Sequence, residues 1–356
     1  RIIAQTCRQS GLSAVYTELL DFGGDEIYLR AFPQLSGKTY GDVLALFETS
    51  AVIGLKTSSG VMLNPPMDTV LLETDEIIAV TADDDTLLLN GTPESIDESV
   101  LCSMPAPQQS PENILILGWN ENAQRIIEEL DYYVANDSRI TVVCEMKEAS
   151  VALRRTERVL RHASVHLIEE DITKRATLDS LLRQDYPHII LLSDRSQEDI
   201  QKADANTLIT LLHLRNIAET TGKRFSIVSE MLDIRNRRLA QVAKVNDFIV
   251  SDTIISLLIA QVSENNILNA VFEDIFDADG SEIYLKPAKA YVCLQEEVSF
   301  YAVVEAARRR GETAFGYKIA AESESETVPG GIHVNPPKSS RIRFTEEDCI
   351  IVAAED

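Results

Sequence analysis

Three patterns in the 356-residue sequence predict an α/β fold, in which a Rossmann-like, doubly wound parallel sheet is combined with two small α+β lobes in tandem. The first pattern is a repeat: GDEIYL at 24–29 returns as GSEIYL at 280–285. The second is an alternation of apolar strands with amphipathic helices between 113 and 251. The third is a proline-rich stretch at 87–112 without hydrophobic periodicity, which is typical of a linker.

The repeat continues on both sides of these six residues, which argues against chance. After the first copy, Asn-Pro-Pro at 64–66 returns as Asn-Pro-Pro at 335–337. The strand-like stretch DEIIAVTADD at 75–84 returns as EDCIIVAAED at 347–356. The chain therefore contains a unit of roughly eighty to one hundred residues twice.

The first copy is expected to be a small α+β lobe over residues 22–86. Before it, residues 1–21 show a helical pattern that breaks at Gly11, which predicts two short crossover helices. From Glu26 onward, strand-like segments alternate with Gly, Pro and Asp turns, and one helix is predicted near 40–48.

The region 113–251 is expected to hold six strands, each leading into a helix. The strands are NILIL (113–117), ITVVC (140–144), VHLI (165–168), HIILL (188–192), FSIV (225–228) and DFIV (247–250). Five helices are predicted between these strands. The first begins near Ala123, the next two run through Leu160 and Leu182, and the last two span about 198–220 and 235–242. This number of strand–helix units is typical of a Rossmann-like domain. Crossover helices at 252–276 and the second small lobe at 277–356 follow.

The two copies of the small lobe differ in what precedes them. The second follows a complete Rossmann-like domain, whereas the first follows only the helical residues 1–21. We therefore expect this sequence to be part of a longer protein, in which another Rossmann-like domain lies before Arg1.

The charge of the chain restricts its partners. With 57 acidic and 33 basic residues, the formal net charge is −24, which argues against nucleic acid and suits divalent cations or basic protein surfaces. The five cysteines are scattered and form no Cys-x-x-Cys pair, so reduced thiols in a cytosolic compartment are expected. Apolar runs such as 254–260 are far shorter than the ~20 residues of a membrane-spanning helix.

The loop after the first central strand resembles a dinucleotide fingerprint with one essential glycine missing. Gly118 and Ala123 fit the first and last positions, and Glu145 ends the second strand, where a ribose-binding acid belongs. Asn120 stands in place of the glycine that lets the backbone approach a pyrophosphate, and Glu121 places a negative charge near it. The pattern favours an inherited scaffold over a working site for NAD.

Acidic residues follow two neighbouring strands of the predicted sheet. Asp194 comes just after the fourth strand, and Glu230 and Asp233 come just after the fifth. Because these strand ends meet at one edge of the sheet, the three carboxylates are candidates for a calcium site built from oxygen ligands. The alternative is that they are solvated surface acids or helix caps. No nucleophile elbow, zinc-protease motif or other catalytic signature is present, so no enzyme is expected.

The order of these domains resembles the regulator-of-conductance (RCK) modules that form gating rings on ion channels. The finer resemblance is to the CASTOR/POLLUX family of channels. It rests on NILILGWNENAQRIIEELD (113–131), SDRSQEDIQKADANTLITLLHLRNI (193–217), EDIFDADGSEIYLKPAKAYV (273–292) and NPPKS (335–339). Short, acidic loops favour a microbial homologue.

This resemblance implies a transmembrane pore upstream of Arg1 and four chains that assemble a tetrameric gating ring. It places this chain on the cytoplasmic side of an integral membrane protein that conducts a cation such as potassium. In calcium-gated RCK channels, carboxylates after the fourth and fifth strands bind calcium; Asp194 and Glu230 fit, but the second acid of the fifth strand falls on Leu232. Related potassium-uptake systems bind NAD or adenine nucleotides.

Three functions therefore remain open. The first is a gating module that senses a ligand such as calcium, and the second is a nucleotide-sensing regulatory subunit of a potassium-uptake transporter. The third, a nicotinamide-dependent enzyme, lacks both an intact glycine fingerprint and a set of catalytic residues.

Overall fold

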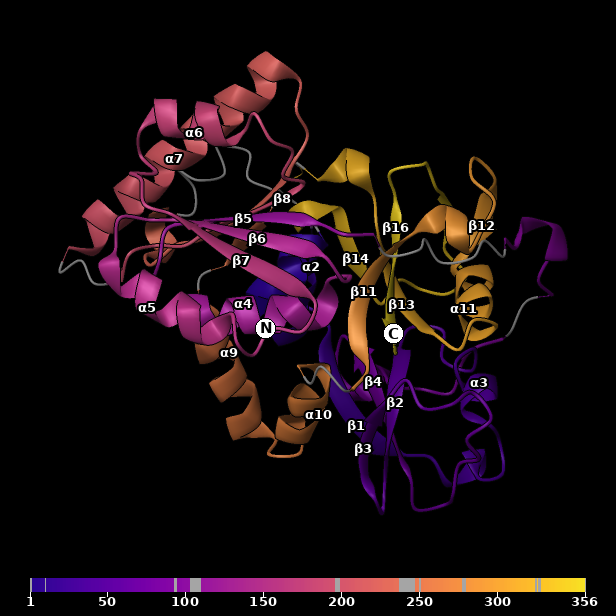
Figure 1. Ribbon diagram of the computed structural model, residues 1–356. Coiled ribbons are helices and arrows are strands. Elements are labelled where there is room, and N and C mark those ends of the chain that lie inside the picture. The colour runs from indigo at the N-terminus through magenta and orange to yellow at the C-terminus, as the bar shows by residue number, and fades with distance from the viewer. Residues whose placement is uncertain are drawn as a thin grey trace. The chain divides into compact units, whose positions relative to one another are not determined.

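The computed structural model (Figure 1) describes every residue except 1, 10, 93–94, 103–109, 196–198, 237–246, 250, 277–279, 324, 326–327 and 356. The chain divides into two compact units, one formed by Arg1–Ser13 and Pro107–Ser256 and the other by Ala14–Ala106 and Leu257–Asp356. Within the described residues, no helix combines the length and the apolar character needed to cross a bilayer.

The first unit is built on a parallel sheet of six strands in the order β10-β9-β8-β5-β6-β7. The strands are β5 (Asn113–Leu117), β6 (Ser138–Val143), β7 (Ala163–Ile168), β8 (His188–Leu191), β9 (Ser226–Glu230) and β10 (Asp247–Ile249). Central strands such as β5 are apolar on both faces because helices cover both, and Leu115 and Ile116 are fully buried. This is the strand order of a doubly wound dinucleotide-binding fold, so the predicted fold class is confirmed.

Helices cover both faces of this sheet. They are α4 (Ala123–Tyr133), α5 (Lys147–Thr156), α6 (Arg175–Leu181) and α7 (Ile200–Thr221). Figure 1 shows α4 and α5 on one face and α6 and α7 on the other. The N-terminal helix α1 (Ile2–Arg8) packs against α4, β8 and β9, and Arg8 pairs with Glu112 at 2.9 Å. Of the helix predicted over 235–242, only the start is described, as the 3-10 turn η4 (Ile234–Asn236).

The second unit contains the two copies of the small lobe, and their sheets have the same antiparallel order, β1-β4-β2-β3 and β11-β16-β13-β14. The strands are β1 (Glu26–Ala31), β2 (Ala51–Thr57), β3 (Gly60–Leu63), β4 (Glu76–Thr81), β11 (Glu282–Pro287), β13 (Thr313–Lys318), β14 (Ile332–Val334) and β16 (Cys349–Ala354). Each sheet has one irregularity at an equivalent place, before Gly54 in β2 and before Gly316 in β13. The repeat in the sequence is therefore a repeat in structure.

The remaining elements complete the two lobes and their crossovers. They are α2 (Leu12–Leu20), α3 (Tyr40–Val43), α9 (Ser251–Glu264), α10 (Leu268–Ile275), α11 (Phe300–Arg308), β12 (Glu297–Ser299) and β15 (Arg341–Arg343). The helix predicted near 40–48 is shorter in the structure and ends at Val43, and carbonyls of the segment after it bond to distant residues. The Leu46 carbonyl accepts from Gly91 N at 2.9 Å, and the Phe47 carbonyl accepts from the Lys338 ammonium.

The two small lobes share one hydrophobic core. Phe47 and Leu55 of the first lobe belong to the same buried cluster as Tyr291, Phe300 and Phe344 of the second. Strands β2 and β13 also contact each other. The apolar face of each sheet is therefore buried against the other copy.

The repeated Asn-Pro-Pro motif joins the lobes through two equivalent asparagines. Asn64 and Asn335 both have left-handed backbones, with φ of 41° and 47°, a conformation that asparagine tolerates better than most residues. Asn64 Nδ2 donates to the Gly311 carbonyl of the other lobe, and Asn335 Nδ2 donates to the Thr49 carbonyl, each at 3.0 Å. The motif is repeated because each copy binds the backbone of its neighbour.

Lys338, three residues after Asn335, adds a one-sided link between the lobes. Only 2% of its surface is exposed, and its ammonium donates to the carbonyls of Phe47 and Ser50. Its backbone N–H donates to the Glu48 carbonyl at 3.0 Å. Burial lowers the pKa of Lys338 to about 7, and the nearby charge of Glu48 opposes this shift in part.

Replacing Lys338 with Met should lower the free energy of unfolding at pH 7 by about 2 kcal/mol, because two buried carbonyls lose their donor. Since the pKa of Lys338 is lower in the folded chain, the unfolded chain binds more protons above pH 7. The stability of the wild type relative to Lys338→Met should therefore rise between about pH 7 and 10. Urea unfolding at several pH values measures both effects, with Lys289→Met, at an exposed ion pair with Glu346, as the control. If the difference in the free energy of unfolding between the wild type and Lys338→Met did not change with pH, the lowered pKa would be contradicted.

Candidate functional site at the carboxyl edge of the parallel sheet

The candidate site lies where β5 and β8 are neighbours and the strand order reverses, the usual ligand crevice of a doubly wound sheet. Gly118, directly after β5, has φ of +89°, and a Cβ atom there would lie 2.4 Å from the Leu192 carbonyl oxygen. Only glycine fits this position. The loop after β5 is thus packed closely against the end of β8.

Asn120 occupies the centre of this crevice and is nearly buried. Its Nδ2 donates to the Ser193 carbonyl at 3.0 Å and to Glu230 Oε2 at 2.7 Å. Its Oδ1 accepts from the backbone N–H of Asn122 at 3.0 Å. The side chain at the position of the missing glycine therefore ties together the ends of β5, β8 and β9.

Glu230, the last residue of β9, has a fully buried carboxylate that is paired within the protein. Arg195 Nη2 donates to its Oε1 at 2.8 Å, while Asn120 occupies Oε2. The Glu230 side chain is 0% exposed and that of Arg195 is 24% exposed. Each carboxylate oxygen thus has a donor, and the negative charge is balanced by the arginine.

The loop after β9 is organised by Asp204, a buried residue of α7. Its two oxygens accept from the backbone N–H groups of Leu232 and Asp233, each at 3.0 Å. Asp204 was not predicted as a site residue from the sequence, although its helical spacing with the buried Thr207 and Leu211 places it on the inner face of α7. A buried acid on such a face requires donors, and the loop supplies them.

Asp233 forms local contacts in the same loop. Arg235 Nη2 donates to its Oδ2 at 2.6 Å, and Gln201 Nε2 donates to the same oxygen at 2.8 Å. The hydrogen bonds from the Arg235 side chain are the main cause that lowers the pKa of Asp233 to about 2. Asp233 is thus ionised and already bonded to cationic and amide donors.

The structure places the predicted calcium ligands on adjacent loops without gathering their oxygens. Asp194 follows β8, and Glu230 and Asp233 belong to the end of β9 and the loop after it. Their ligand atoms do not all lie within 4.8 Å of one another. The calcium site stays a prediction. Glu145, the predicted ribose-binding acid, is exposed after β6, and a function for it likewise stays a prediction.

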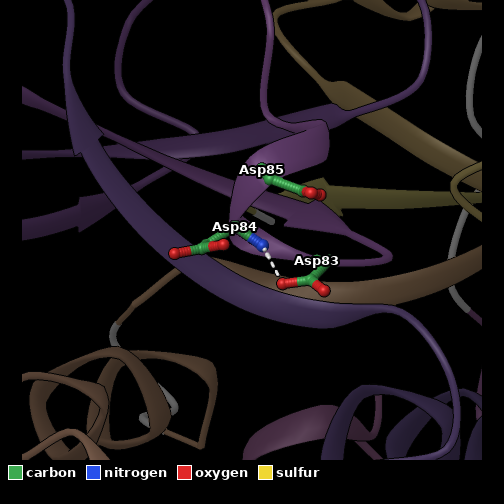
Figure 2. A group of neighbouring side chains, drawn as sticks. All are labelled: Asp83, Asp84 and Asp85. Carbon is green, nitrogen blue, oxygen red and sulfur yellow. Dashed lines mark hydrogen bonds between the residues drawn. The ribbon is translucent and has the colours of Figure 1, made fainter.

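Among the described residues, one group of three acids does bring its ligand atoms within 4.8 Å. It consists of Asp83, Asp84 and Asp85, all exposed, in the second unit (Figure 2). Asp83 Oδ1 accepts from the Asp84 backbone N–H at 2.7 Å, and Asp83 forms a capping box with Thr86 at the start of a 3-10 turn. The sequence of this turn is therefore explained by capping.

The two units together have the elements of a channel gating ring: a Rossmann-like domain and paired α+β lobes. The structure of the human SLO3 gating ring matches 99% of this chain and 74% of that chain, with a TM-score of 0.72 and 12% identity, which establishes a similar fold. A family model described as "Castor and Pollux, part of voltage-gated ion channel" matches residues 1–97.

Alignments with channel proteins that cover nearly all of this chain extend the match beyond residue 97. Ion channel CASTOR of Lotus japonicus is 30% identical over 392 residues, which cover 100% of this chain and 45% of that protein. The probable ion channel POLLUX of Oryza sativa subsp. japonica is 29% identical over 388 residues, covering 99% and 39%. The chain is thus a homologue of the CASTOR/POLLUX family of ion channels, and it spans less than half the length of these relatives.

Replacing Asn120 with Ala should lower the free energy of unfolding by about 2 kcal/mol, because the Ser193 carbonyl and the Glu230 carboxylate each lose a buried donor. Asn122→Ala is the matched control, since the Asn122 side chain makes no capping hydrogen bond at the start of α4. It should change the free energy by less than about 0.5 kcal/mol. Chemical unfolding of the three proteins makes the comparison, and equal stabilities would show that the Asn120 contacts are energetically neutral.

Proposed function

We propose that this chain is the regulatory gating region of a CASTOR/POLLUX-like cation channel, which couples the binding of a ligand to the opening of a pore. The observation that carries this proposal is that the alignment with Lotus CASTOR covers the whole chain, while the fold matches a gating ring over 99% of it. The homologues are ion channels, which argues against the nicotinamide-dependent enzyme.

The same proposal includes two kinds of assembly. The chain would be joined to a transmembrane pore, and four such chains would form a ring. Crossover helix α9 supports self-association, because Ile255 is 53% exposed and Ile259 is 62% exposed. Residues four apart lie on the same face of a helix, so these two form one apolar surface.

If α9 mediates self-association, Ile259→Glu should shift the chain toward monomer, because a charge would be buried in an apolar contact. Light scattering across a concentration series measures the change. Leu212→Glu, on α7, replaces a residue that is 53% exposed and serves as the control. A wild type that stays monomeric throughout, or an equal effect of both substitutions, would count against α9 as the interface.

For the ligand, we propose calcium at the carboxyl edge of the parallel sheet, with Asp194, Glu230 and Asp233 as the candidate ligands. Two features support a cation as the ligand. They are the net charge of −24 and the buried carboxylate of Glu230 at the sheet edge where the strand order reverses. Because Arg195 and Asn120 hold the two oxygens of Glu230, calcium would have to displace Arg195. Binding would then release the loop after β8, which provides a direct link between ligand and conformation.

A nucleotide-sensing subunit of a potassium-uptake transporter is the second candidate. A pyrophosphate needs close approach to the backbone after β5. The Asn120 side chain fills that place, and the buried Glu230 carboxylate lies 2.7 Å from it. These two observations favour calcium over NAD or an adenine nucleotide.

Calorimetric titration of the chain with calcium, NAD(H) and ATP tests these candidates. Glu230→Gln should abolish calcium binding, whereas Arg195→Gln should tighten it about tenfold, because it removes the cation that competes for Glu230. Calcium should also stabilise the wild type by about 2.7 kcal/mol at a hundredfold excess over its dissociation constant.

The control for this titration is Glu346→Gln, which removes an exposed acid that pairs with the exposed Lys289 and should leave calcium binding intact. Equal losses in Glu230→Gln and Glu346→Gln would show that calcium only screens the general negative charge. Binding of NAD(H) or ATP without calcium binding would favour the transporter subunit.

A further inference from the structure

Two cysteines that are far apart in the sequence meet in the second unit. Cys102 Sγ lies 3.2 Å from Cys293 Sγ, within hydrogen-bond range for sulfur. Both side chains are half-buried, whereas Cys7 and Cys144 are buried. The two thiols are thus adjacent to each other and partly open to solvent.

The backbone around the two cysteines is held in place by a short β-bridge between Leu101 and Val292. Cys102 N–H donates to the Tyr291 carbonyl, and Cys293 N–H donates to the Val100 carbonyl, both at 2.8 Å. These bonds fix the two segments side by side, independently of the sulfur atoms.

An ion pair adds to this attachment. Arg309, at the C-terminal end of α11, donates through two guanidinium nitrogens to Glu98, at 2.6 and 2.7 Å. Glu98 begins the 3-10 turn η3 (Glu98–Val100) and lies three residues before Leu101 of the bridge. A disulfide bond needs the two sulfurs to approach by only about 1 Å, from 3.2 Å to the covalent distance. That change requires side-chain rotation and little movement of the backbone.

We propose that Cys102 and Cys293 are a redox-sensitive pair that forms a reversible disulfide when the chain meets a peroxide. The bond would fix the segment 98–102 to the second lobe. This inference concerns the linker side of the second unit and does not depend on the gating function or on calcium.

Either sulfur can donate the hydrogen bond that joins them, and the Cys293 thiol also donates to the Ser99 carbonyl at 3.4 Å. The hydrogen bond between the sulfurs is the main cause that raises the pKa of the Cys102 thiol, and burial adds to the shift. Donation to a neighbouring sulfur stabilises its thiolate, which is the reactive nucleophile.

The reaction balances with hydrogen peroxide as the oxidant. The thiolate of one of the two cysteines attacks one peroxide oxygen, the O–O bond breaks, and the released hydroxide takes up a proton to become water. The other cysteine then loses its proton and attacks the sulfur of the sulfenic acid, so the S–O bond breaks and a second water leaves. Overall, two thiols and one peroxide give one disulfide and two waters.

The disulfide would close a covalent loop between residues 102 and 293 that contains all of Pro107–Ser256. A cross-link over so long a loop restricts the unfolded chain far more than the folded one. Oxidation should therefore raise the melting temperature of the second unit, and a reducing agent should reverse the rise.

The test treats the whole chain with a small excess of hydrogen peroxide, followed by blocking of remaining thiols and peptide mapping by mass spectrometry without reduction. The expected result is one dominant cross-linked peptide pair, Cys102 to Cys293, which disappears on reduction. Thermal unfolding of the same samples should show a higher melting temperature only in the oxidised wild type.

Three variants separate this pair from general thiol oxidation. Cys102→Ser and Cys293→Ser should each abolish the cross-link and the rise in melting temperature, whereas Cys349→Ser, at another half-buried cysteine, should retain both. Intermolecular cross-links, random pairing among the cysteines, or sulfinic acid at Cys293 without a disulfide would overturn the proposal. Equal oxidation of Cys349 and the pair would do the same.

Discussion

The burial of two apolar sheet faces against each other is the constraint on which the second unit depends. A lobe with one four-stranded sheet has too small a core to be stable alone, and its apolar face must be covered. Here the cover is the second copy of the same lobe, so Phe47 and Leu55 share a core with Tyr291 and Phe300. Duplication of the lobe thus solves the problem that a single lobe would have.

The polar contacts between the lobes follow from this arrangement. Turns brought into the shared interface carry backbone groups that need partners once water is excluded. Asn64 and Asn335 supply those partners in equivalent ways, while Lys338 serves only the first lobe. The asparagine contacts are therefore close to symmetric, whereas the Lys338 contacts run in one direction, from the second lobe to the first.

In the first unit, side chains of the protein itself fill the position where a doubly wound sheet usually binds a ligand. A dinucleotide site needs open backbone after the first strand, but Asn120 closes that space and holds Glu230. Arg195 neutralises the resulting buried charge. In the described structure, both oxygens of the Glu230 carboxylate are thus occupied by donors of the protein itself.

The local pattern of apolar residues was sufficient to predict the six parallel strands, the described helices α4 to α7 between them and the duplicated lobes. Periodicity is a property of neighbouring residues, and it indicates which face of each element is buried. Gly118 and Asn120 could also be recognised in the sequence as positions of a phosphate-binding turn, because the residues of such a turn lie close together in the chain. The end of helix α3 at Val43, rather than near residue 48, was not predicted, and the carbonyls of Leu46 and Phe47 after it bond to the distant Gly91 and Lys338.

Only the tertiary structure decided which distant residues meet. The sequence placed Glu230 at a sheet edge but could not indicate that Arg195 and Asn120 occupy its oxygens. Asp204 and the cysteine pair Cys102 and Cys293 were likewise hidden, since their partners lie tens to hundreds of residues away. Composition and periodicity describe each segment alone, whereas the partner of a buried charge or thiol is set by how the segments pack.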